Sequence, residues 1–171
     1  LHKKGEEQEA FAAYDSCLQW KDDNVMALNN YAYYLSEKGV DLHKAESMSY
    51  KTIKAEPNNG TYLDTYAWIL FMEERYADAK TYIDQALKNR DSTADNSTVL
   101  EHAGDIYYMN GMTDESVDFW KKAYTGENQT EVLAWKIKNR QYITEEELKK
   151  RNAPKQKPAA TKKSVRKGKK K

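Results

Sequence analysis

The chain has 171 residues, of which 32% are charged, and it carries 13 tyrosines and 4 tryptophans but only 3 phenylalanines and 3 prolines. Its longest apolar run, residues 66–72, is far too short for a membrane-spanning helix, which needs about 20 apolar residues. The single cysteine, Cys17, cannot form an internal disulfide, and we expect it in a helix core. These features exclude a disulfide-stapled scaffold and a membrane-spanning helix within this sequence.

Charge is strongly segregated along the chain. Twelve of the 28 lysines and arginines lie in residues 149–171, which contain no acidic residue, so residues 1–148 hold 16 basic residues against all 27 acidic ones. The net charge of +1 therefore conceals an acidic body and a basic tail, which we treat as two functional units. Because the tail has no apolar periodicity, we expect residues 149–171 to be disordered.

Residues 5–130 contain an internal repeat with a period near 34 residues. Small residues open helical segments at steps of 35, 34 and 37 residues: Ala10, Ala45, Ala79 and Ser116. Leucines recur at steps of 35 and 37 residues, each followed four positions later by a small residue: Leu28, Leu63 and Leu100. A regular period of this length predicts a repeat architecture.

Each repeat is predicted to contain two helices joined by a short turn. Apolar residues recur at three- and four-residue spacing, which is typical of an amphipathic helix, in the first segments 27–39, 62–75 and 99–111. The second segments show the same period and end in Pro57 or in polar clusters: 43–59, 76–91 and 113–128. Turns are predicted at Gly39, at residues 74–75 and at Gly111.

Small residues predict where the two helices of a hairpin touch. Antiparallel helices approach closely only where a side chain is small, so we expect Ala67 and Ala79 to lie at the contact between the helices of one hairpin. Larger residues are expected to fill the space on either side: Tyr66, Leu70, Ile83 and Leu87. Because one hairpin cannot bury both of its faces, successive hairpins must stack.

These segments resemble the tetratricopeptide-repeat (TPR) family, in which small and large residues alternate at set positions of a helix pair. The second unit matches in "LNNYAYYL" with "AESMSYKTIKAEP", and the third in "LDTYAWIL" with "ADAKTYIDQAL". The fourth matches in "LEHAGDIY" with "SVDFWKKAY", where Gly104 takes the small site and Trp120 the large one. The sequence departs from the family pattern at Ser49, Asp91, Asn128 and an insertion at 94–96.

The resemblance implies an all-α, right-handed superhelical solenoid of antiparallel helix hairpins. Its expected parts are the second helix of a truncated first TPR (1–24), three TPR units (25–59, 60–93 and 97–130), a capping helix (131–148) and the disordered Lys-rich tail (149–171). In the capping helix we expect Val132, Leu133, Trp135 and Ile137 to be available to the last hairpin, while Lys136, Lys138 and Arg140 face water.

No catalytic constellation is apparent in the sequence. There is no phosphate-binding loop, no Cys-x-x-Cys pair and no serine elbow. His102 lies near Glu101 and Asp105, but such a group is more often a solvated surface than a metal site. His2 and His43 have no companions. We therefore expect a protein that is not an enzyme, with no metal and no cofactor.

The resemblance also implies that the first helices line a concave groove that binds a peptide. It assigns to this face Asn29, Asn30, Tyr33, Asp64, Thr65, Trp68, Phe71, Glu101, His102, Asp105 and Tyr108. Aromatic, amide and acidic side chains together suit a peptide with basic and apolar side chains. Packing between repeats is the alternative role of Trp68 and Phe71.

Some TPR proteins clamp acidic C-terminal tails with an asparagine, a lysine and an arginine. Asn30 matches the asparagine, but Thr61 and Thr65 occupy the two cationic sites, so this ligand is disfavoured. The predicted function is a non-catalytic protein–protein interaction scaffold or adaptor that binds a peptide segment in the groove.

The basic tail carries an alternative function. It could tether the protein electrostatically to nucleic acid or to an anionic membrane surface. The cations assigned to this role are Lys162, Lys163, Arg166, Lys167, Lys169, Lys170 and Lys171. A merely solvated tail is the other interpretation of the same charge run.

The sequence starts at a leucine and resembles long bacterial repeat proteins, so we expect the C-terminal part of a longer protein. The resemblance favours the bacterial cell envelope or periplasm, with the cytoplasm as the alternative. An enzyme domain upstream of Leu1 stays open.

Overall fold

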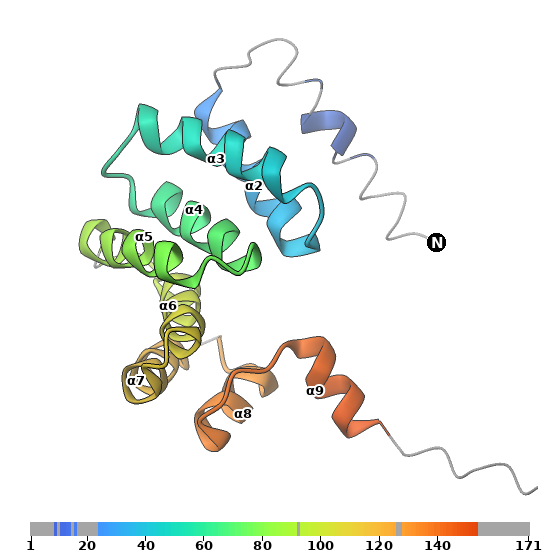
Figure 1. The fold of residues 1–171 in the computed structure, drawn as a ribbon, viewed down its shortest axis with the longest axis vertical. Helices are drawn as coiled ribbons and strands as arrows, with labels where there is room; N and C mark the ends of the chain where they lie inside the picture. The colour runs from blue at the N-terminus through green and yellow to red at the C-terminus, as the bar shows by residue number, and fades with distance from the viewer. Residues whose placement is uncertain are drawn as a thin grey trace, which may run out of the picture.

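The computed structural model describes residues 9, 11–14, 16, 24–91, 93–125 and 128–153, and all regular secondary structure in these ranges is helical (Figure 1). The helices are α2 (Val25–Lys38), α3 (Leu42–Ala55), α4 (Gly60–Met72), α5 (Tyr76–Asn89), α6 (Ser97–Met109), α7 (Thr113–Ala123), α8 (Glu131–Asn139) and α9 (Glu145–Asn152). The all-α fold expected from the sequence is confirmed.

Three antiparallel hairpins, α2/α3, α4/α5 and α6/α7, stack one on the next (Figure 1). The first helices contact one another, α2 with α4 and α4 with α6, while α3 packs on α4 and α5 packs on α6. The first helices therefore form a continuous row along the stack.

Local side chains define where the first helices begin and end. The Asn24 side chain accepts a hydrogen bond from the Ala27 amide at 3.0 Å, and Asn59 caps α4 in the same way. Such caps satisfy backbone N–H groups that have no partner within the helix. Gly39 ends α2 in the left-handed conformation, with φ of 65°, which glycine adopts without a steric cost.

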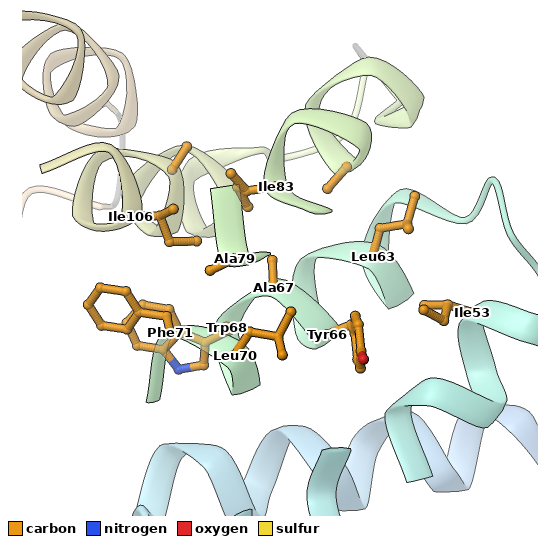
Figure 2. Packing of buried hydrophobic residues seen from close by; sticks show 12 residues of the cluster. Ile53, Leu63, Tyr66, Ala67, Trp68, Leu70, Phe71, Ala79, Ile83 and Ile106 are labelled. Carbon is orange, nitrogen blue, oxygen red and sulfur yellow. The ribbon is translucent and has the colours of Figure 1, made fainter. Parts of the chain in front are cut away.

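The hairpin α4/α5 packs around the two alanines that the sequence singled out. Ala67 and Ala79 have no exposed surface and belong to one core cluster (Figure 2). Leu70 and Ile83 beside them are also fully buried, and Tyr66 is 6% exposed. Each buried aliphatic side chain of this size contributes about 1.5–3 kcal/mol. The predicted contact between small residues in this hairpin is confirmed.

Size complementarity is even tighter in the hairpin α6/α7. Trp120 is fully buried, and a Cβ atom placed on Gly104 would overlap atoms of its indole ring. The prediction that Gly104 takes the small site and Trp120 the large one is confirmed. Only glycine leaves the indole room at this position.

Little of the expected first unit falls within the described residues. Residues 9, 11–14 and 16 are helical, and the rings of Phe11 and Tyr14 pack against Tyr31 of α2 with centroids 5.7 and 5.4 Å away. Cys17 and the rest of residues 1–23 lie outside the described part.

The capping segment differs from the prediction, because residues 131–148 contain two helices instead of one. Helix α8 ends at Asn139, where Arg140 takes a left-handed conformation with φ of 54°. Helix α9 begins after Thr144, whose hydroxyl accepts from the Glu147 amide at 3.2 Å, while the Glu147 carboxylate accepts from the Thr144 amide at 2.9 Å. This reciprocal capping box gives α9 a start of its own.

Helix α9 continues to Asn152, so the prediction of disorder is wrong for residues 149–152. Lys149 and Lys150 pair with Glu145 and Glu146 one helical turn earlier, at 2.5 and 2.7 Å. Residues 154–171, including all seven cations assigned to an anion-binding tail, lie outside the described residues. Among the helices described, none is both long and apolar enough to cross a membrane.

Candidate functional site

Two adjacent hollows open along the row of first helices. The first, which we call the amide hollow, has a volume of about 620 Å³ and lies between α2, α4 and the loop before α6. Six asparagines line it: Asn29, Asn30, Asn58, Asn59, Asn89 and Asn96. Amide side chains both donate and accept hydrogen bonds, and the Nδ2 groups of Asn59, Asn89 and Asn96 already donate within the protein.

The second hollow, the acidic hollow, has a volume of about 470 Å³ and reaches from α2, α4 and α6 to α8 and α9. Five carboxylates line it: Glu37, Glu101, Asp105, Glu145 and Glu146. His102 and Lys136 also line this hollow. Tyr33 and Thr98 line both hollows, so the two form one continuous polar surface.

Asn29 brings an unsatisfied acceptor to the amide hollow. The residue is 5% exposed, and its Oδ1 atom is buried without a hydrogen-bond partner among the residues that the structure describes. A buried amide oxygen left unpaired costs about 1–3 kcal/mol. A small turn of the side chain toward the hollow would let a ligand donate a hydrogen bond to this atom and recover part of that free energy.

His102 is the centre of a buried cluster that joins three first helices. Its Nδ1 lies 2.9 Å from Asp64 Oδ1 on α4, and its ring stacks on Trp68 with centroids 4.1 Å apart. The Trp68 indole also stacks on Phe71 and donates to Glu37 of α2 at 2.9 Å. Burial alone lowers the pKa of His102, but the charge and hydrogen bond of Asp64 outweigh it and raise that pKa above 6.5.

A second buried cluster ties α8 to the first helices. Lys136 Nζ lies 2.7 Å from Asp105 Oδ1 and 3.1 Å from Glu101 Oε1. Trp120 Nε1 donates to the same Asp105 oxygen at 2.9 Å. Burial lowers the pKa of Lys136, but the two carboxylates more than offset this and raise it. The prediction that Lys136 faces water is wrong, because α8 turns this residue toward the carboxylates of α6.

Nine of the eleven residues assigned to the groove line the two hollows. The amide hollow receives Asn29, Asn30, Tyr33, Asp64 and Thr65, and the acidic hollow receives Tyr33, Trp68, Glu101, His102 and Asp105. Phe71 is 5% exposed and belongs to the core cluster of α4 and α5. Tyr108 packs beside Trp120 at a centroid distance of 5.9 Å. Neither of these two rings lines a hollow.

Two further lining residues, Glu37 and Lys136, escaped the sequence reasoning. Glu37 is the acceptor for the Trp68 indole across 31 positions, and Lys136 reaches Asp105 across 31 positions. Both look like ordinary solvent-facing charges in a helical pattern. The one signal for them in the sequence is that the indole N–H of Trp68 and the carboxylate of Asp105 each need a hydrogen-bond partner when they are buried.

The two threonines that occupy the cationic positions of a carboxylate clamp lie together in the amide hollow. Thr61 and Thr65 both line it, and the Thr65 hydroxyl donates to the Thr61 carbonyl at 3.2 Å. Among the described residues that line this hollow, Arg90 is the single cationic side chain, against Asp64, Asp91 and Asp95. The lining therefore favours cationic over anionic ligands.

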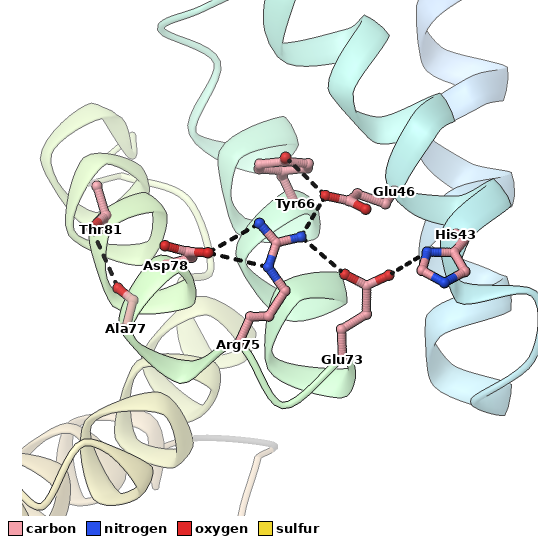
Figure 3. Close-up of polar contacts among 8 residues, drawn as sticks. All are labelled: His43, Glu46, Tyr66, Glu73, Arg75, Ala77, Asp78 and Thr81. Carbon is pink, nitrogen blue, oxygen red and sulfur yellow. Dashed lines mark hydrogen bonds and ion pairs between the residues drawn. The ribbon is translucent and has the colours of Figure 1, made fainter.

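The expectation that His43 has no companions is also wrong. Its Nδ1 lies 3.5 Å from Glu73 Oε1, and Glu46 is close by (Figure 3). These residues lie away from both hollows and form a separate cluster.

The stacked hairpins define the class of protein, a helical-repeat solenoid. No protein-family model matches the sequence. A stretch of 66 residues, 39% of the chain, is 35% identical to a TPR repeat-containing protein of Pseudomonas aeruginosa, PA4667. The match spans only 11% of that protein.

Solved structures show the same fold. PilF of Pseudomonas aeruginosa superposes with a TM-score of 0.67 at 16% identity, over 81% of this chain and 61% of that one. YrrB, described as a TPR protein with an unusual peptide-binding site, gives 0.60 at 14% identity, over 73% and 62% of the two chains. The chain therefore has the tetratricopeptide-repeat fold.

Proposed function

We propose that this protein is a non-catalytic interaction scaffold that binds an extended peptide segment of a partner along its first helices. The observation that carries the proposal is the amide hollow, in which the buried Asn29 Oδ1 has no hydrogen-bond partner within the described part of the chain. An extended peptide presents backbone N–H groups at regular intervals, and such groups are suitable donors to this oxygen and to the neighbouring amides. The likeness to YrrB, whose description names a peptide-binding site, supports the same role.

The charges of the lining select the side chains of that peptide. Carboxylates outnumber cations in both hollows, and in the acidic hollow the ammonium of Lys136 is already shared by Asp105 and Glu101. Glu37 and Glu146 lie at the same hollow. We therefore propose a segment with basic and apolar side chains, because lysine or arginine would pair with these carboxylates.

A non-catalytic role is consistent with the pairing of the buried ionisable side chains. His102 is tied to Asp64 and stacked on Trp68, and Lys136 is enclosed by carboxylates. Groups held in this way stabilise the array. Asp64→Ala and Trp68→Ala are consequently poor probes of binding, because both would disturb the stacking of the repeats.

A cleaner test uses the exposed amide of Asn30. Fluorescence anisotropy would compare a labelled peptide of about ten residues, alternating lysine and leucine, with a matched peptide carrying glutamate in place of lysine. We expect the basic peptide to bind more tightly, and Asn30→Ala to weaken it about fivefold, the equivalent of one hydrogen bond. Gln85→Ala is the matched control, because this exposed amide on α5 lines neither hollow.

The basic tail must be controlled for, because it would attract an acidic peptide by itself. The same titrations are therefore repeated on a full-length variant in which all seven tail cations assigned above are changed to glutamine. Tighter binding of the acidic peptide to this variant would refute the proposal. Binding that disappears with the tail charges and with added salt would instead favour the electrostatic tether.

A further inference from the structure

A cluster of potential metal ligands lies where the hairpins α2/α3 and α4/α5 meet. His43 and Glu46 are three positions apart on α3, so they share one helix face, and Glu73 caps the C-terminus of α4 (Figure 3). One imidazole nitrogen and one oxygen from each carboxylate lie within 4.8 Å of one another. His43 is exposed on its outer side, with 99% of its side chain accessible.

Glu73 supplies an oxygen that is met by the His43 ring at 3.5 Å but receives no hydrogen bond from the described residues. The Glu73 side chain is only 9% exposed, and in the described ranges its Oε1 atom is buried with no hydrogen-bond partner. The other oxygen accepts a long bond of 3.3 Å from Arg75. A carboxylate this buried usually has both oxygens hydrogen-bonded. Leaving Glu73 Oε1 beside His43 without a hydrogen bond therefore costs free energy.

The charges around the cluster leave room for a further cation. Arg75 directs its Nε and one terminal nitrogen at Asp78, at 3.1 and 3.0 Å, and shares the remaining nitrogen between Glu46 and Glu73. Three carboxylates therefore surround a single guanidinium. The Tyr66 hydroxyl also donates a long hydrogen bond of 3.4 Å to Glu46 Oε1.

We propose that His43, Glu46 and Glu73 form a zinc-binding site. One imidazole and two carboxylates are a donor set that Zn²⁺ accepts, with a water molecule in the fourth position. Tetrahedral bonds of about 2.0–2.1 Å place neighbouring ligand atoms about 3.3–3.4 Å apart, and His43 Nδ1 lies 3.5 Å from Glu73 Oε1. Mg²⁺ and Ca²⁺ fit less well, because they prefer six or more oxygen ligands.

Zinc would displace only part of the existing network. The terminal nitrogen of Arg75 would leave Glu46 and Glu73, while the two contacts to Asp78 hold the guanidinium in place. Because α3 and α4 belong to different hairpins, the bound ion would fasten one repeat to the next. The site lies outside the amide and acidic hollows, so it does not depend on the proposed peptide binding.

The test is calorimetric titration of ZnCl₂ into the full chain and three full-length variants near neutral pH, after circular dichroism has verified their folding. We expect one zinc ion per chain at this site, and affinity that falls at least about tenfold in His43→Asn and in Glu73→Gln. His43 is exposed, so its replacement should not impair folding. Glu74→Gln is the matched control, since it removes the same charge one residue away from the cluster and should change affinity less than about twofold.

Nuclear magnetic resonance of the His43 ring gives an independent readout. Substoichiometric zinc should shift or broaden the His43 signals before those of the buried His102. Equal affinity of the parent and His43→Asn would overturn the proposal, and so would equal losses in Glu73→Gln and Glu74→Gln. In either case the contact between His43 and Glu73 would be an ordinary ion pair.

Discussion

Lys136 and Asp105 form an ion pair of 2.7 Å in which each side chain is 4% exposed. Lys136 comes from α8, outside the three hairpins, while Asp105 lies on α6. The pair also holds the indole of Trp120 through Asp105. The segment after the last hairpin is therefore fastened by buried charge as well as by the apolar packing of Leu133.

Lys136→Met should strongly destabilise the protein. The substitution leaves Asp105 buried without its cation, and breaking a buried pair in this way costs about 3–5 kcal/mol. Chemical denaturation with urea would measure the change in the free energy of unfolding. Lys138→Met is the control, because this exposed lysine on the same helix should contribute less than about 0.5 kcal/mol. A loss below about 1 kcal/mol for Lys136→Met would show that Asp105 is readily rehydrated.

Gly104→Ala should destabilise the hairpin α6/α7 by about 1–3 kcal/mol, because the new methyl group overlaps the Trp120 indole. The sign of the effect should reverse when Trp120 is replaced by leucine. Alanine has a higher helix propensity than glycine by about 1 kcal/mol, and no steric clash then opposes it. A double-mutant cycle from thermal or urea unfolding would measure the coupling. Additive effects of the two substitutions would contradict direct contact.

The Asp64–His102 pair should make stability depend on pH. Because the pKa of His102 is raised above 6.5 in the folded state, folding favours the protonated ring. This contribution is complete below the unfolded value of about 6.5 and is lost as pH rises through the folded pKa. The difference in unfolding free energy between the protein and Asp64→Asn should therefore shrink as pH rises above 6.5. Urea unfolding at several pH values measures that difference, and a difference that grows with pH would contradict the assignment.

Much of the repeat could be predicted because it depends on local spacing. The amphipathic period defines a helix within its own segment, and the short turns at Gly39 and Gly111 force neighbouring helices to be antiparallel. Residue size at Ala67, Ala79 and Gly104 then indicates where the hairpins close. Thr144 and Glu147, which form the capping box of α9, can also be recognised in the sequence. The start of α9 was not predicted, because the adjacent acidic residues also suit a turn or a helix end.

The sequence by itself indicated the helical hairpins, their stacking and nine of the residues that line the two hollows. Only the tertiary structure decided which of those side chains pair with one another. Asp64 with His102, Asp105 with Lys136 and Glu73 with His43 join residues 30 or more positions apart. Helical periodicity says which face a charge occupies, but it is silent about the partner that the next repeat brings there, and a buried charge is stable only where that partner arrives.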